Sequence, residues 1–267
     1  MVKIDIGTAG WDYKDWVGSF YPKQLERARY LKYFSKYFDI VEINSTFYSV
    51  PSLDMVKNWK LRVPEKFRFI VKVWQKITHN LNDPELDSNI VTFFSTMKLL
   101  KEKIMAFLFQ FPPWFKFSES HLGKLKSLFK ELPSEYKYIV ELRDNSWFYS
   151  EILTQFIDGD QVILGTTYMP EVIPYYMENQ NYYYIRLIGD RKLTIFNRIQ
   201  RNQKNALTDL YKNVQILREI PEIYEIFIIV NNHFQGSAPE SVNNLRKKFG
   251  IKFHSFNSQK SISEYIK

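Results

Sequence analysis

Residues 138–143 read Tyr138-Ile139-Val140-Glu141-Leu142-Arg143, a short apolar run that ends in charged side chains. An exposed strand would not need charged residues at its end. Seven similar runs of β-branched and aromatic residues recur along the chain. Stretches of helical periodicity separate most of them, which favours a parallel sheet with crossover connections. Eight such units predict a TIM-type (β/α)8 barrel with its active site at the carboxyl ends of the strands. The other runs are Lys3–Gly7, Ile40–Asn44, Arg68–Val73, Ala106–Phe111, Gln161–Thr166, Tyr182–Gly189 and Glu225–Asn232.

Apolar stripes at helical spacing between these runs predict the covering helices. A first helix is expected over Pro22–Phe38, a second from a Ser52 cap toward Leu61, and a fifth over Trp147–Ile157. The sixth crossover, Pro170–Asn181, contains two prolines and no clear period, so we expect it to be irregular or one turn long. Ser237 is expected to open a capping box at the start of a last helix. Three further stripes are Ile90, Phe93, Phe94, Met97 and Leu100; Leu122, Leu125, Leu128, Phe129 and Leu132; and Leu207, Leu210, Val214 and Leu217.

The composition indicates one soluble globular domain over residues 1–267, with a short extension from about residue 251. The chain has 267 residues and 45% hydrophobic content, and α/β barrels routinely fill roughly 250 residues as one unit. No apolar run approaches the roughly 20 residues that cross a bilayer, and the amino terminus opens directly into a strand, so we expect a cytoplasmic protein without a membrane partner.

The charge balance favours anionic partners. A formal net charge of +8 and an isoelectric point near 9.3 would attract an anionic small molecule or nucleic acid, although dispersed lysines on a soluble surface explain the charge equally well. The chain has no cysteine, which removes disulfides, thiolate nucleophiles and thiolate metal sites together. The sequence does not indicate the oligomeric state.

Polar side chains end six of the eight predicted strands. Because residues two apart share a face of a strand, Glu42 points with Asn44, and Glu141 points with Arg143. We therefore expect these side chains to converge inside the barrel mouth as a ligand site, and the alternative is a buried ion-pair network that only plugs the barrel. By the same parity, the set also includes Lys72, Gln110, Arg186 and Asn231.

Two carboxylates beside cations provide the minimum for acid and base catalysis, and Glu42 and Glu141 are the candidates. Such a pair fits glycoside hydrolysis, proton abstraction or simple hydroxyl binding. Aromatic residues in strand-following segments, Tyr48 and Trp147 among them, offer flat faces on which sugars or bases stack, or else they only brace the loops.

The segments after the last two strands predict an anion subsite. Asn231 and His233 lead into the helix start at Ser237, and Gly189-Asp190-Arg191 adds a flexible turn and a cation. His79 and His233 could join the carboxylates, but no ligand spacing such as H-E-x-x-H appears, so we expect neither a metal nor a cofactor. No dinucleotide glycine pattern and no G-x-S-x-G elbow is present.

A set of segments in order along nearly the whole chain resembles the domain-of-unknown-function 72 family, also called YecE-like. The resemblance implies a TIM-type barrel with its pattern residues at the barrel mouth, and an affinity of the family for nucleic acid has been suggested. The segments that carry it are Gly7-Thr8-Ala9-Gly10-Trp11, Trp16-Val17-Gly18-Ser19-Phe20-Tyr21-Pro22, Val41-Glu42-Ile43-Asn44-Ser45-Thr46-Phe47-Tyr48, Lys72 with Ile77-Thr78-His79, Phe109-Gln110-Phe111-Pro112-Pro113, Glu141-Leu142-Arg143 with Ser146-Trp147, and Val230-Asn231-Asn232-His233.

The chain departs from the family pattern at three places. Ile188 stands where strand seven of the family has a histidine, Thr166 and Thr167 stand where strand six often ends at an aspartate, and Ser241-Val242 replaces Asn-Ala. If those family residues are catalytic, this member is altered or inactive.

The sequence leaves three hypotheses open. The first is an enzyme, of the hydrolase or lyase type, that acts on or binds a phosphate-bearing or nucleotide-like ligand at the barrel mouth. The second is a non-catalytic nucleic-acid-binding module, and the third is a carbohydrate hydrolase with two carboxylates.

Overall fold

The fold is a closed parallel barrel, seen in a computed structural model that describes residues 2–253 and 255–256. Each strand pairs in parallel with the next, and β8 returns to pair with β1, so no strand edge stays open. The predicted TIM-type (β/α)8 barrel is confirmed. The strands are β1 Lys3–Ala9, β2 Ile40–Ile43, β3 Arg68–Lys72, β4 Ile104–Gln110, β5 Tyr138–Glu141, β6 Val162–Tyr168, β7 Tyr182–Leu187 and β8 Glu225–Val230.

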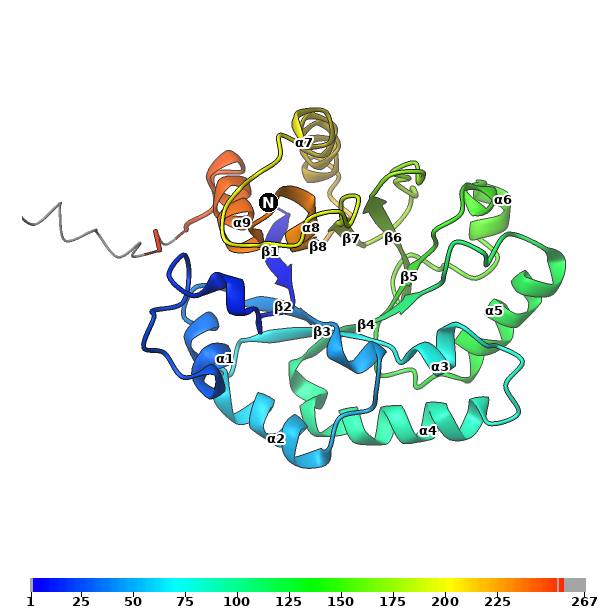
Figure 1. Ribbon diagram of the computed structural model, residues 1–267. Coiled ribbons are helices and arrows are strands. Elements are labelled where there is room, and N and C mark those ends of the chain that lie inside the picture. Colours follow the sequence, from blue (N-terminus) through cyan, green and yellow to red (C-terminus); the bar gives the residue numbers. More distant parts are fainter. Residues whose placement is uncertain (1, 254, 257–267) are drawn as a thin grey trace, which may run out of the picture.

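The helices lie outside the strands and form the outer layer (Figure 1). Helices α1, α2, α4 and α5 lie outside the first half of the barrel, and α7 and α9 lie outside the second half. In the described part of the chain, no helix is both long and apolar enough to cross a membrane. The helices are α1 Tyr30–Phe34, α2 Leu53–Arg62, α3 Gln75–Thr78, α4 Leu86–Met97, α5 Glu119–Glu131, α6 Ser150–Leu153, α7 Lys204–Arg218, α8 Asn232–Gln235 and α9 Ala238–Lys248, with 3-10 turns η1 Lys14–Trp16, η2 Arg27–Arg29, η3 Ser45–Phe47, η4 Lys98–Lys103 and η5 Asn145–Trp147.

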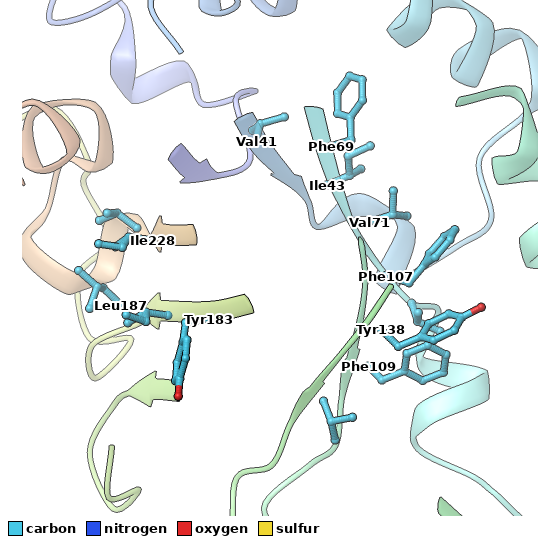
Figure 2. Packing of buried hydrophobic residues seen from close by; sticks show 14 of the residues in the cluster. Val41, Ile43, Phe69, Val71, Phe107, Phe109, Tyr138, Tyr183, Leu187 and Ile228 are labelled. Atoms are coloured by element: carbon cyan, nitrogen blue, oxygen red, sulfur yellow. The ribbon is translucent and has the colours of Figure 1, made fainter. Parts of the chain in front are cut away.

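The strands separate two apolar layers, because alternate side chains point to opposite faces of a sheet. Ile70, Leu108 and Tyr184 belong to a small cluster inside the barrel. The residues between them, such as Val71 and Phe107, belong to the large cluster against the helices. Figure 2 shows this outer set, with the labelled side chains pointing away from the barrel interior. The parity that the sequence predicted for the strand ends is therefore correct.

Most of the expected helices form, but the first is much shorter than predicted. Ser52 caps α2 by accepting a hydrogen bond from the backbone N–H of Met55 at 3.2 Å. The prediction of a helix over Pro22–Phe38 is wrong, because Glu26 has extended backbone angles and only η2 and α1 are helical. The chain folds back there so that the ring of Tyr21 stacks on Tyr30, with ring centroids 3.9 Å apart.

The fifth and sixth crossovers are the irregular part of the barrel. The expected fifth helix is reduced to η5 and the four residues of α6. Residues 169–181, all of which the structure describes, contain no helix, as the two prolines of this crossover predicted.

The amino end of the last helix differs from the expected capping box. Within the described residues, the Ser237 side chain makes no capping hydrogen bond, although Pro239 does lie in the first turn. The Asn232 side chain instead accepts from the backbone N–H of Ala238 at 3.0 Å. The expected carboxyl-terminal extension is described only as far as Phe256, which packs against Phe20, and residues 257–267 lie outside the described residues.

The amino end of the barrel is closed by an ion-pair cluster. Arg68 donates to both carboxylate oxygens of Glu225, at 2.8 and 2.6 Å, and also pairs with Asp5. Lys3 pairs with the same two carboxylates, at 2.6 Å from Glu225 and 2.9 Å from Asp5. Two cations thus meet two carboxylates at this end, and the cluster is balanced in charge.

The Glu225→Ala substitution tests how much this cluster stabilises the barrel. We expect the free energy of unfolding to fall by about 2 kcal/mol, since removing one partner of a largely buried pair leaves Arg68 under-compensated. The matched control Glu135→Ala removes the carboxylate of an exposed pair with Lys101 and should change stability by less than about 0.5 kcal/mol. Equal losses in urea unfolding would contradict a stabilising role for the cluster.

Candidate functional site

Arg186 lies at the centre of a polar cluster inside the carboxyl end of the barrel. It lies on β7 with 3% of its surface exposed, and its guanidinium reaches across the barrel to β2 and β5. Its Nη2 donates to Glu42 Oε1 at 2.5 Å and to Asn44 Oδ1 at 3.2 Å. Its Nη1 donates to Glu141 Oε2 at 2.9 Å. One side chain therefore joins three strands.

Glu42 is fully buried and has a second partner inside the barrel. The Tyr184 hydroxyl donates a short hydrogen bond to Glu42 Oε2. Tyr184 stands two residues before Arg186 and so shares its face of β7. Burial, with the negative charge of Glu42, raises the pKa of Tyr184 well above its usual range, which keeps the hydroxyl protonated as a donor.

Glu141 is also fully buried, and it is surrounded by cations. Arg143 donates from Nε to Glu141 Oε1 at 2.7 Å, and the same oxygen lies 3.3 Å from Arg186 Nη1. Burial alone would raise the pKa of Glu141, but Arg186, Arg143 and Lys72 outweigh it and lower the pKa to about 2. Glu141 is therefore a permanently charged carboxylate at physiological pH and a poor proton donor.

Lys72 is a buried lysine whose pKa lies near neutrality. It ends β3 with 6% of its surface exposed, and its Nζ donates to Gln110 Oε1 at 3.0 Å. The ammonium also lies 3.7 Å from the centroid of the Phe47 ring. Burial, followed by the positive charge of Arg186, lowers the pKa of Lys72 from 10.5 to about 7, although Glu141 and Glu42 act in the opposite direction.

The side chain of Thr46 connects the ends of the strands that carry these groups. The hydroxyl of Thr46, in the turn after β2, donates to the Lys72 carbonyl at 2.6 Å, and its oxygen lies 3.0 Å from the Ile43 carbonyl oxygen. The end of β2 is therefore tied to the end of β3. This holds the backbone of Asn44 and of Lys72 in register at the mouth.

Three further residues lie at the cluster, and the sequence analysis named one of them. Arg191, the cation predicted for the anion subsite, follows β7, and its partial desolvation beside Arg143 and Arg186 lowers its pKa. Thr167 lies opposite Arg186 on β6, and its buried hydroxyl has no hydrogen-bond partner among the described residues. Tyr184 was not among the candidates but could have been found, since it shares the parity of Arg186.

The remaining candidates are spread around the rim. Tyr48 is 71% exposed beside Phe47. His79 is half-buried between Phe47 and Trp114, and burial, with the charge of Lys72, lowers its pKa.

The two candidates after β8 lie apart from the carboxylates. Asn231 uses its side chain to accept from the backbone N–H of His233, which caps α8. Burial and then Arg191 lower the pKa of His233. A Cβ atom at Gly189 would lie 2.4 Å from the His233 carbonyl oxygen, so the turns after β7 and β8 pack closely only because residue 189 is glycine.

The expectation that Trp147 offers a stacking face at the rim is wrong. Trp147 has no exposed surface, its ring stacks on Phe115 with centroids 5.5 Å apart, and its Nε1 donates to the Phe115 carbonyl at 2.7 Å. Trp16 is equally buried and donates to Asn232 Oδ1. These two indoles brace the loops and do not reach a ligand.

The exposed parts of the cluster are its cations. Glu42 and Glu141 have no exposed surface, whereas Lys72 and Arg143 keep 6% and 7%. A ligand that enters the mouth would therefore meet positive charge first. No group of three or more His, Asp or Glu side chains in the described chain is arranged to hold a metal ion.

The barrel and its charged carboxyl end define a class: (β/α)8-barrel proteins with a polar, mainly cationic mouth. Within that class, the chain belongs to the family described as Protein of unknown function DUF72, which matches residues 5–264.

Relatives of the same family cover most of the chain. The UPF0759 protein YunF of Bacillus subtilis is 25% identical over 94% of this chain and 96% of its own length. The UPF0759 protein YecE of Escherichia coli K12 is 29% identical over 54% of this chain and 50% of its own length. The crystal structure of a DUF72 family protein from Thermotoga maritima is similar, with a TM-score of 0.76, 25% identity, and coverage of 93% of this chain and 99% of that one.

The low pKa of Glu141 predicts how stability depends on pH. At any pH above 4.5, the ordinary pKa of a glutamate, the charged carboxylate of Glu141 stabilises the fold. This stabilisation is lost as the pH falls toward about 2, the pKa of Glu141 in the folded protein. Glu141→Gln should lower the free energy of unfolding by roughly 3 kcal/mol at pH 7, and by about half as much at pH 3. Urea unfolding at several pH values measures the difference.

The exposed carboxylate of Glu131 on α5 supplies the control. Glu131→Gln should change stability little at any of these pH values. A difference between wild type and Glu141→Gln that stays constant from pH 7 to pH 3 would show that Glu141 is not held charged by its cations.

Proposed function

We propose that the barrel mouth binds a phosphate-bearing, nucleotide-like ligand and that the protein is an enzyme of the hydrolase or lyase type. The observation that carries this proposal is an excess of positive charge. Two buried carboxylates of the described chain, Glu42 and Glu141, face three buried cations, Lys72, Arg143 and Arg186, and the exposed Arg191 adds a fourth positive charge at the mouth.

This excess is a local property of the carboxyl end. The cluster at the amino end pairs Lys3 and Arg68 with Asp5 and Glu225, which leaves no net charge. Buried charges are normally paired, because an unpaired charge is costly to desolvate. An ion-pair network that only plugged the barrel would be expected to balance at both ends. A bound dianion would balance the mouth.

The same geometry supports a division of roles. Glu42 and Glu141 are fully buried and bonded to Arg186, so we assign them to orienting the arginines rather than to contact with the ligand. Arg143 would hold the anion as a planar donor. Lys72, with a pKa of about 7, would donate or accept the proton that the reaction transfers, because a catalytic acid or base works best when its pKa lies near the ambient pH.

The other two hypotheses are less well supported. Glycoside hydrolysis requires a sugar between the two carboxyl groups, but here the Arg186 guanidinium occupies that space. A nucleic-acid-binding module would use dispersed surface charge and not a buried cluster of this kind, and its affinity would fall steeply with salt. A cytoplasmic location stays a prediction.

Sulfate binding as a function of pH tests the proposal, because sulfate keeps the same charge over the range used. Affinity should fall as the pH rises through about 7 and Lys72 loses its proton, by up to about tenfold per pH unit between pH 7 and 9. Isothermal titration calorimetry at fixed ionic strength gives the affinities. The charged groups that face Lys72 are Arg186, Arg143, Glu141, Glu42 and His79.

Two variants separate Lys72 from these neighbours. Lys72→Arg keeps its charge and should bind sulfate with little pH dependence, whereas Lys72→Met should bind at least tenfold more weakly below pH 7. Lys101→Ala removes the same charge from an exposed position at the opposite end of the barrel and should bind like wild type. Failure of the wild type to bind sulfate or phosphate, or equal losses in Lys72→Met and Lys101→Ala, would reject the proposal.

A further inference from the structure

A hollow of about 640 Å³ opens beside the charged mouth. It lies between the loop after β1, the start of the segment after β2, and α2. Ligand pockets commonly measure 300–1,000 Å³, so this hollow holds far more than a phosphate group. Its lining includes Trp11, Tyr13, Arg27, Asn44, Met55 and Trp59.

The hollow borders the Arg186 cluster at Asn44, although Lys72, Arg143 and Arg186 do not themselves line it. Asn44 lines the hollow, and its Oδ1 accepts from Arg186 Nη2 at 3.2 Å. Tyr13 lines the same space, and its hydroxyl donates to the Ala9 carbonyl, at the carboxyl end of β1. A single ligand could therefore reach both the arginines and the hollow. Another hollow, beside Tyr168 and Asp209, contains none of the residues of the Arg186 cluster.

The walls of this hollow suit a flat aromatic group. Trp11 is partly exposed and stands edge-on to the buried Trp59, with ring centroids 5.8 Å apart and an interplanar angle of 87°, so Trp59 holds the Trp11 ring in place at the wall of the hollow. Met55 adds a polarisable side chain that is 48% exposed. Base stacking on aromatic side chains depends on such faces and tolerates any base, because every base has a π-face.

Polar groups at the edge of the hollow match the rim of a base rather than a second phosphate. Arg27 donates to both carboxylate oxygens of Asp12, at 2.7 and 2.8 Å, so its charge is already compensated. Arg62 donates to the Ala28 carbonyl at 2.7 Å. The edge thus offers carboxylate acceptors and guanidinium donors side by side.

We propose that this hollow binds the base of a nucleotide whose phosphate is bound by Arg143 and Lys72. The inference rests on the proposed function and names its ligand class, a nucleoside 5′-phosphate or a terminal nucleotide of a strand. Trp11 and Met55 would contact the base. Asn44 would lie beside the sugar, which joins the base to the phosphate.

Calorimetric titration of the full-length protein with two probes tests this inference. Adenosine 5′-monophosphate should bind about tenfold or more tightly than ribose 5-phosphate, because the base adds a stacking contact. Trp11→Ala and Met55→Glu should each remove about tenfold of the nucleotide affinity and leave ribose 5-phosphate unchanged. Met55 is half-exposed, so its variant should fold even if Trp11→Ala does not, and Tyr149→Ala removes an exposed aromatic residue elsewhere as the control.

Each outcome decides between the two proposals. Equal affinities for the two probes would overturn the base pocket and leave the phosphate site standing. Tighter nucleotide binding that neither Trp11→Ala nor Met55→Glu weakens would place the base elsewhere and also overturn it. If neither probe binds, the proposed function and this inference both fail.

Discussion

The guanidinium of Arg186 is the interaction on which the carboxyl end of this barrel depends. It bonds Glu42 from β2 and Glu141 from β5 at once, and both carboxylates are fully buried. Burying a carboxylate without a partner is costly, because desolvating an isolated carboxylate costs several kcal/mol. Removing the arginine would therefore leave Glu42 without its cation and Glu141 with Arg143 alone as its ion-pair partner. Arg143 and Lys72 lie beside this bridge, where their charges also lower the pKa of Glu141.

The bridge also decides which groups remain for chemistry. With both carboxylates engaged by Arg186, the surface that reaches the mouth belongs to cations, and the apolar cluster below them excludes water from the barrel interior. In such surroundings a lysine loses its proton more easily, which explains why the pKa of Lys72 falls to about 7. The acid and base roles that two glutamates suggest in the sequence are therefore given to Lys72 in the proposed function, in which Glu42 and Glu141 orient the arginines.

The sequence predicted the barrel and the convergence of its polar strand ends, because the two-residue period of a strand fixes the face of each side chain. Glu42, Glu141 and Arg186 meet for that reason. The same reasoning failed where no period applies: Trp147 is packed under a loop, and the first helix is interrupted at Glu26. Which groups pair with each other also depends on distances across the barrel, so the pKa values of Glu141 and Lys72 could not be derived from the strand pattern.

The central claim is that the mouth carries uncompensated positive charge that a dianion fills. Anomalous diffraction from crystals soaked in tungstate or selenate tests it most directly, since the anion is located by its own scattering. We expect an anion within hydrogen-bonding distance of Arg143 and Lys72, with Glu42 and Glu141 still bonded to Arg186. Anions found only on surface lysines, with the mouth holding water alone, would contradict it.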